Sequence, residues 1–104
     1  MAEGYISKDI VHKSYYAENS GLKVCANRID NQVIVSVTGT TTAVIPQYQW
    51  IGIIDDASNR PPHNVRLYDR TGEQFQVSAS SGAIQPIVEL SSGTLLSAYC
   101  IYSI

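Results

Sequence analysis

The residues best suited to chemistry lie between Trp50 and Tyr68. Carboxylates, amides, guanidinium groups and an imidazole are gathered here near aromatic rings: Asp55, Asp56, Asn59, Arg60, His63, Asn64 and Arg66. Rings can stack on the apolar face of a sugar while planar polar groups hydrogen-bond its hydroxyls. The stretch therefore indicates contact with a polar, hydroxyl-rich ligand. An ordinary solvated loop is the alternative, and for Trp50 taken alone a core position is favoured.

Groups that could carry catalysis are few. Asp55 and Asp56 are adjacent, and adjacent side chains of an extended chain point in opposite directions, so they form a poor acid/base pair. Cys25 and Cys100 each lie in an apolar run, where burial would raise the pKa of a thiol. Glycine-rich phosphate loops and clusters with metal-ligand spacing are not found in the sequence. We therefore expect a non-enzymatic protein with no catalytic residue, no metal and no cofactor.

Composition excludes several classes of partner. The 104 residues carry a net charge of −2, only 15% are charged, and Lys and Arg form no run. Nucleic-acid binding needs a basic surface to neutralise phosphates, so no nucleic-acid partner is expected. No apolar run reaches the ~20 residues that span a bilayer, so no membrane insertion is expected. The N-terminus lacks the basic-then-apolar pattern of a secretory signal, which predicts synthesis in the cytoplasm.

The two cysteines are widely separated and match no zinc motif. Two buried, free thiols are the favoured interpretation. A disulfide is possible only outside a reducing compartment, and the sequence leaves this open.

The elements that must position these residues are strands. The strongest signal is a hairpin from Leu22 to Gly39, in which two alternating runs are interrupted by Asp30-Asn31. Further strands are predicted over 48–54, 65–68, 73–79, 83–90 and 94–104, separated by Gly- and Ser-rich turns, with the longest loop at 55–64. We expect one all-β domain of about eight short antiparallel strands, a jelly-roll-like barrel or sandwich. Residues 1–21 are interpreted as a lead-in or neck and 22–104 as the domain.

An ordered set of short motifs carries a family resemblance. It comprises the hairpin 27–39, Ile45-Pro46, Asn59-Arg60-Pro61-Pro62, Asp69-Arg70-Thr71-Gly72 and the ending from Gly93-Thr94-Leu95 to Ile104. From Leu22 onward the chain resembles the C-terminal heads of tail-fibre and receptor-binding proteins of phages of Gram-positive bacteria. Such heads usually follow a long anchor and shaft, whereas only about twenty residues precede this one.

The resemblance implies a function and a set of partners. It implies a homotrimeric head at the virion tail tip, attached to other tail or baseplate proteins, which binds a host cell-wall saccharide. Its matched loop residues are Arg60 and His63, with Trp50, Asp55 and Tyr68 nearby. Two alternatives remain: a structural virion or assembly domain without a ligand, which a core position for Trp50 would favour, and a cellular β-sandwich lectin or adhesin.

Overall fold

The chain folds as antiparallel strands, which confirms the all-β prediction. The computed structural model describes residues 12–70 and 72–104. The strands are β1 (His12–Asn19), β2 (Leu22–Ile29), β3 (Gln32–Thr40), β4 (Gly52–Ile53), β5 (Val65–Asp69), β6 (Gly72–Val77), β7 (Ala83–Pro86) and β8 (Leu95–Ser103). A short 3-10 turn, η2 (Ala57–Asn59), lies in the predicted long loop.

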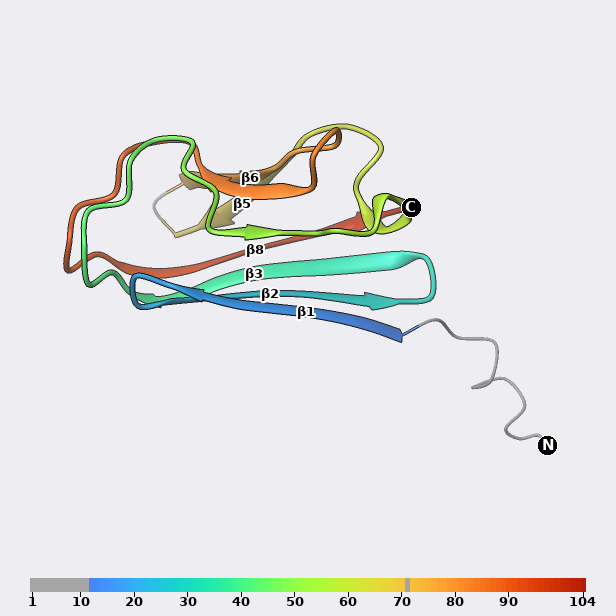
Figure 1. Cartoon of the computed structure of the whole chain (residues 1–104), viewed down its shortest axis with the longest axis horizontal. Coiled ribbons are helices and arrows are strands. Elements are labelled where there is room, and N and C mark those ends of the chain that lie inside the picture. Colours follow the sequence, from blue (N-terminus) through green and yellow to red (C-terminus); the bar gives the residue numbers. More distant parts are fainter. Residues whose placement is uncertain (1–11, 71) are drawn as a thin grey trace.

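All eight strands belong to one sheet, in the order β1-β2-β3-β8-β5-β6-β7-β4. β1, β2, β3 and β8 form one wall, and β4, β5, β6 and β7 fold over it as a second wall (Figure 1). The edge strands β1 and β4 come close together without a shared ladder. The result is a nearly closed barrel with a seam between its two edges.

The sheet begins earlier than the sequence suggested. β1 lies inside the segment interpreted as a lead-in, yet it pairs with β2 along its whole length, from His12↔Ile29 to Asn19↔Leu22. Tyr15 and Ala17 are only half-buried because β1 is an edge strand. The alternation of apolar and polar residues is therefore weak, and it was missed. Residues 1–11 lie outside the described part of the chain.

The predicted hairpin is confirmed as β2 and β3, and a second tight turn joins β1 to β2. Val24 pairs with Val37 and Ala26 with Val35, and all four point into the barrel. Ser20 and Gly21 both have positive φ, at 49° and 87°, which a two-residue type I′ turn requires. A Cβ on Gly21 would lie 2.2 Å from the carbonyl oxygen of Thr40, so only glycine fits there.

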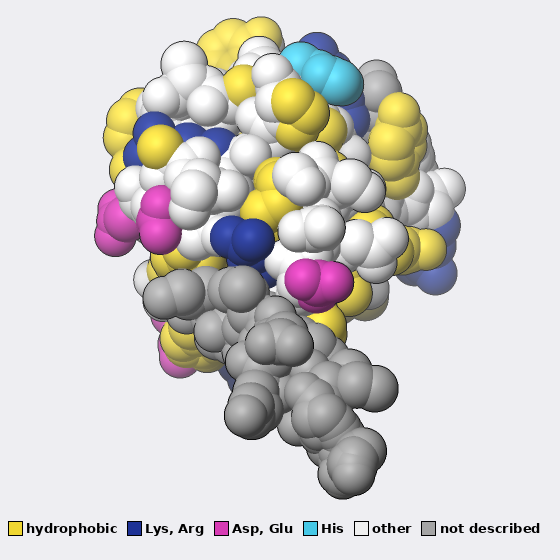
Figure 2. Space-filling view, turned by 90° about the vertical axis from the view of Figure 1, so that its right-hand side faces the viewer, with side chains coloured by type: hydrophobic (Ala, Val, Ile, Leu, Met, Phe, Trp, Pro, Cys, Tyr) yellow, Lys and Arg dark blue, Asp and Glu magenta, His cyan; other side chains and the backbone are white. Residues whose placement is uncertain are grey.

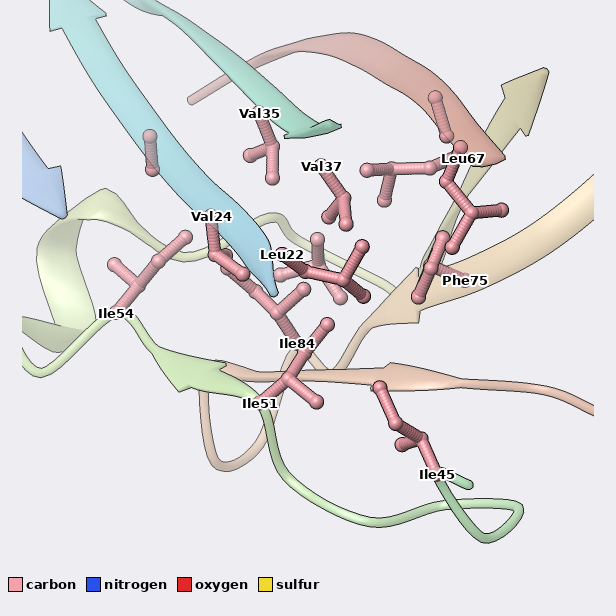
Figure 3. Packing of buried hydrophobic residues seen from close by; sticks show 14 of the residues in the cluster. Leu22, Val24, Val35, Val37, Ile45, Ile51, Ile54, Leu67, Phe75 and Ile84 are labelled. Atoms are coloured by element: carbon pink, nitrogen blue, oxygen red, sulfur yellow. The ribbon is translucent and has the colours of Figure 1, made fainter. Parts of the chain in front are cut away.

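The core fills the barrel with aliphatic side chains, Phe75 and Tyr102. Figure 3 shows residues from both walls pointing toward one another, and those it labels are Leu22, Val24, Val35, Val37, Ile45, Ile51, Ile54, Leu67, Phe75 and Ile84. Burying each such side chain stabilises the fold by about 1.5–3 kcal/mol before conformational entropy is counted. Because the core lies between the walls, every strand has one face available for other contacts.

Two predicted strands are shorter than expected. The strand expected over 48–54 is reduced to β4, and the one over 83–90 ends at Pro86. Proline has no N–H to continue a ladder, and Tyr48 opposite it has a φ of +65°, outside the strand region. The two segments still run side by side, because Tyr48 N donates to the oxygen of Pro86 and Ile51 N to that of Ile84, both at 2.9 Å.

Candidate binding site

The polar loop predicted over 55–64 closes one end of the barrel, beside the C-terminus (Figure 1), and we call its residues 56–64 the plug loop. Its buried Asn59 accepts a hydrogen bond at Oδ1 from Nη1 of Arg28 (2.6 Å) and donates through Nδ2 to the hydroxyl of Tyr15 (2.5 Å). The carbonyl oxygen of Asn59 accepts from the hydroxyl of Tyr102 (2.6 Å). Asn59 thus connects β1, β2 and β8, and serves as a plug rather than a ligand contact.

Arg60 holds the same loop in place. Its Nε donates to the carbonyl oxygen of Ile54 (2.8 Å), Nη2 to that of Asp55 (2.9 Å) and Nη1 to that of Ser80 (3.1 Å). Each guanidinium nitrogen therefore has a main-chain acceptor. The predicted ligand residue Arg60 has a structural role here, in which it fixes the position of Asp55.

Two other polar groups of the loop, Asp56 and Asn64, follow the same pattern. Oδ1 of Asp56 accepts from both N (3.0 Å) and Oγ (2.8 Å) of Ser58 and caps η2. Oδ1 of Asn64 accepts from the main-chain N of Ala79 (2.9 Å). His63 is exposed on the loop. Figure 2 shows this end of the molecule as a mosaic of apolar, basic, acidic and polar groups.

Trp50 lies at the surface, so the core interpretation was wrong. Its side chain is 54% exposed, and that of Tyr48 is 53% exposed. Buried Ile51 anchors the segment to β7, and a turn in which Gln49 N donates to the oxygen of Pro46 (3.2 Å) precedes it. The positive φ of Tyr48 is a strained conformation for a bulky residue, and such strain often occurs at functional sites.

A groove of about 230 Å³ lies at the seam between β1 and β4. Val24, Ala26 and Ile84 contribute apolar side chains to its lining. Ile53, Asp55 and Tyr16 line it with exposed side chains. Pockets for drug-sized ligands begin near ~300 Å³, so this one suits a single ring.

Main-chain groups add polarity to the seam. Asn19 and Leu22 flank the two-residue turn and form a hydrogen-bonded pair, so N–H and C=O of Tyr16 and Glu18 point away from β2, toward the seam. Some Cα atoms of β1 and β4 are within 8 Å of each other. An inserted strand would need ~9.6 Å, twice the strand spacing, so the groove is too narrow for a peptide strand.

The segment Tyr48–Asp55 unites these features, and we call it the edge segment. Its exposed side chains are Tyr48, Trp50, Ile53 and Asp55, together with Gln49. Of the predicted site residues, only Trp50 and Asp55 lie on it, and Arg60 supports it from below.

The remaining predicted residues lie elsewhere. Tyr68 is on the outer face of β5, opposite Tyr99 of β8. Tyr48 was not predicted as a candidate site residue, because a regular strand was expected over 48–54. Pro46 followed by two aromatics, two residues apart, was the available signal.

The thiol of Cys100 and the phenol of Tyr16 are held in their protonated forms. Cys25 faces outward and Cys100 inward, so these two cannot form a disulfide within one chain, and both are free. Both are half-buried, so full burial was wrong. Burial raises the pKa of Cys100 to about 11, and its thiol stays protonated at neutral pH. Tyr16 donates to Oε2 of Glu18 (2.8 Å), and this hydrogen bond, ahead of desolvation, raises its pKa.

Within the described residues, no group of three or more His, Cys, Asp and Glu side chains is arranged to hold a metal ion. Over the same residues, no helix is long and apolar enough to cross a membrane.

Comparison with known proteins places the chain in no family. Its sequence matches no family model, and no curated protein is significantly similar to it.

Proposed function

We propose that this chain is a non-enzymatic binding domain that recognises a cell-surface saccharide along its edge segment. The observation that carries the proposal is the exposure of Trp50, 54%, beside the equally exposed Tyr48. Exposed aromatic rings on a rigid β scaffold are suited to stacking against the apolar faces of sugar rings. Aromatic residues on a flexible loop would lose more conformational entropy on binding than residues on this scaffold.

The groups around the aromatics match the needs of a hydroxylated ligand. The carboxylate of Asp55 accepts hydrogen bonds from hydroxyls, and main-chain groups of β1 line the seam groove beside it. The groove volume of about 230 Å³ suits one sugar ring. A saccharide chain could therefore have one ring in the groove and another against Trp50.

The biological setting proposed here rests on the family resemblance of the sequence. It is a host-receptor-binding head of a phage tail or baseplate fibre, located at the virion tail tip and bound to other tail proteins. Copies of the head in a homotrimer, and many fibres on one particle, would convert weak single-site binding into avidity.

A structural domain without a ligand is the second candidate, and the same fold would serve it. The observation in its favour is the amount of exposed apolar surface outside the edge segment, at Leu95, Tyr99 and Ile101. A cellular lectin or adhesin would use the edge segment in the same way as the phage head. Those settings differ in the partners of the chain, not in the site.

The test is saccharide binding by the purified chain on a cell-wall glycan array, followed by calorimetry on the best ligand. We expect Trp50→Ala to weaken binding tenfold to hundredfold, about 1.4–2.7 kcal/mol, because the stacking surface is lost. His63→Ala is the control, since His63 is exposed on the plug loop. Unchanged binding in Trp50→Ala, or a larger loss in His63→Ala, would overturn the assignment to the edge segment.

A further inference from the structure

The outer face of β3 and β8 carries no charge, and its large side chains are mostly apolar. Its outward side chains are Gln32, Ile34, Ser36, Thr38, Thr40, Leu95, Ser97, Tyr99, Ile101 and Ser103. The solvated face of an antiparallel sheet is normally polar, yet Leu95, Tyr99 and Ile101 are 68%, 62% and 57% exposed. We call this surface, together with Tyr68 of β5, the β3–β8 face.

Strand register makes the apolar residues neighbours. Tyr99 lies opposite Tyr68 on one side and Ser36 on the other, and Ile101 lies opposite Ile34. Side chains that face each other across antiparallel strands have Cβ atoms about 4.5–5.5 Å apart. Tyr68, Tyr99, Ile34 and Ile101 therefore form one continuous apolar cluster, and Leu95, opposite Thr40, lies beyond Ser97 toward the start of β8.

The apolar area of the face is that of a large surface patch. At their exposed fractions, the five large side chains of the face leave on the order of 500 Å² in water. The largest apolar patch of a typical monomer is about 300–600 Å² and often functional. With the serines and threonines between them, the area approaches the roughly 800 Å² per partner of a specific protein interface.

The border of the face also has interface character. A hollow of about 310 Å³, lined by Leu95, Ser97, Asp69 and Arg70, lies at one end of β8. Asp69 and Arg70 bring opposite charges to the same place. An apolar, tyrosine-containing centre with charges confined to the border is the usual anatomy of a protein interface.

We propose that the β3–β8 face joins copies of this chain. The outward side chains of β3 and β8 offer no charge to a charged partner, whereas an uncharged face matches a copy of itself. Symmetric contact also removes the same apolar cluster from water on every copy, which helps a domain that buries only about two-thirds of its surface alone. The inference rests on the self-association part of the proposed function but does not require the saccharide site.

The experiment measures molar mass in solution by light scattering. The wild-type chain is compared with Ile101→Glu, Tyr99→Glu and Leu95→Ser, and with Val44→Glu as the matched control. Val44 is 53% exposed but lies outside the face. We expect a multiple of the single-chain mass for wild type and Val44→Glu, and the single-chain mass for Ile101→Glu and Tyr99→Glu. Leu95→Ser should lower the association constant about tenfold or more.

These side chains point outward, so the variants should keep the wild-type urea midpoint and far-ultraviolet circular dichroism. A wild-type chain that remains single at millimolar concentration would overturn the inference. So would folded Ile101→Glu and Tyr99→Glu variants that keep the wild-type mass. Calorimetry with saccharide separates this result from the proposed function, because a single chain that still binds saccharide leaves the edge segment supported. An assembled chain that binds no saccharide would support the β3–β8 face and contradict the assignment of the edge segment.

Discussion

The plug loop and the edge segment are neighbours in sequence but differ in how they use their side chains. In the loop, the side chains of Asn59 and Arg60 all reach partners within the protein. In the edge segment, Tyr48 and Trp50 are more than half exposed on a backbone fixed by β7. Polar side chains close together in sequence therefore indicate a ligand site only when the protein itself does not satisfy them.

The largest effect on stability is expected at Asn59. Asn59→Ala should lower the free energy of unfolding by about 2–4 kcal/mol, because it leaves Nη1 of half-buried Arg28 and the hydroxyl of Tyr15 without the side chain that they contact. Urea unfolding followed by circular dichroism measures this. Saccharide affinity of the fraction that remains folded should stay within twofold of wild type.

Trp50→Ala is the matched control, for which we expect the opposite pattern of effects on stability and affinity. Its stability should change by less than about 0.5 kcal/mol, since its ring contributes to no buried cluster, while its affinity falls. If Asn59→Ala were as stable as wild type, the plug assignment would be wrong.

Arg60→Lys tests whether the loop needs a guanidinium or only a charge. Lysine keeps the positive charge but cannot donate to three separated carbonyl oxygens from a planar group. We expect a loss of about 1–2 kcal/mol in the free energy of unfolding, read from the urea midpoint. Asp55 should also be less well fixed, which would weaken saccharide binding a few-fold. A wild-type midpoint in Arg60→Lys would show that the charge alone holds the loop.

The differences between these regions explain what the sequence could and could not predict. The hairpin of β2 and β3 was predictable because Val24, Val35 and Val37 alternate with polar residues and a turn separates the two runs. β1 was missed because an edge strand buries its inward residues only partly, so alternation is weak. Arg28 of β2 and Asn59 of the plug loop hydrogen-bond to each other but are 31 residues apart in sequence. No local sequence pattern predicts such a contact.

The edge segment was mispredicted for a related reason. Trp50 stands in a run of β-branched and aromatic residues, which is the pattern of a buried strand. Two features outside that pattern place it at the surface: Pro86 ends the neighbouring ladder, and the left-handed Tyr48 changes the path of the chain. Propensity could identify an extended segment here, but only the tertiary pairing decides which of its side chains are exposed.

Tyr48→Gly tests whether the edge segment retains a strained backbone conformation for binding. Glycine adopts positive φ without steric cost, so relief of the strain at φ +65° should raise the free energy of unfolding by about 0.5–1 kcal/mol. Saccharide affinity should fall, because one of the two exposed aromatic rings of the edge segment is lost. A more stable variant that binds less well would show that strain is retained for binding. A less stable variant would show that the ring of Tyr48 instead supports the fold.

Alkaline pH gives a further test, and it acts on the contact between Tyr102 and Asn59. Burial, followed by the charges of Cys100 and Tyr15, raises the pKa of Tyr102, whose hydroxyl donates to Asn59. Burial raises the pKa of Cys100 from 9.0 to about 11. A group with a raised folded-state pKa holds its proton in the native protein after the unfolded chain has lost it. Its contribution to stability is therefore complete below the unfolded pKa and declines as pH rises above that value.

The urea midpoint should thus be flat up to about pH 9 and then decrease, through Cys100 between pH 9 and 11 and through Tyr102 above about pH 10. Cys100→Ala should remove the earlier part of the decrease, and Tyr102→Phe the later part, at the cost of the hydrogen bond to Asn59. Trp50→Ala should follow the wild-type profile, because the edge segment contributes neither group. If the alkaline decrease were unchanged in both Cys100→Ala and Tyr102→Phe, groups other than Cys100 and Tyr102 would control stability at high pH.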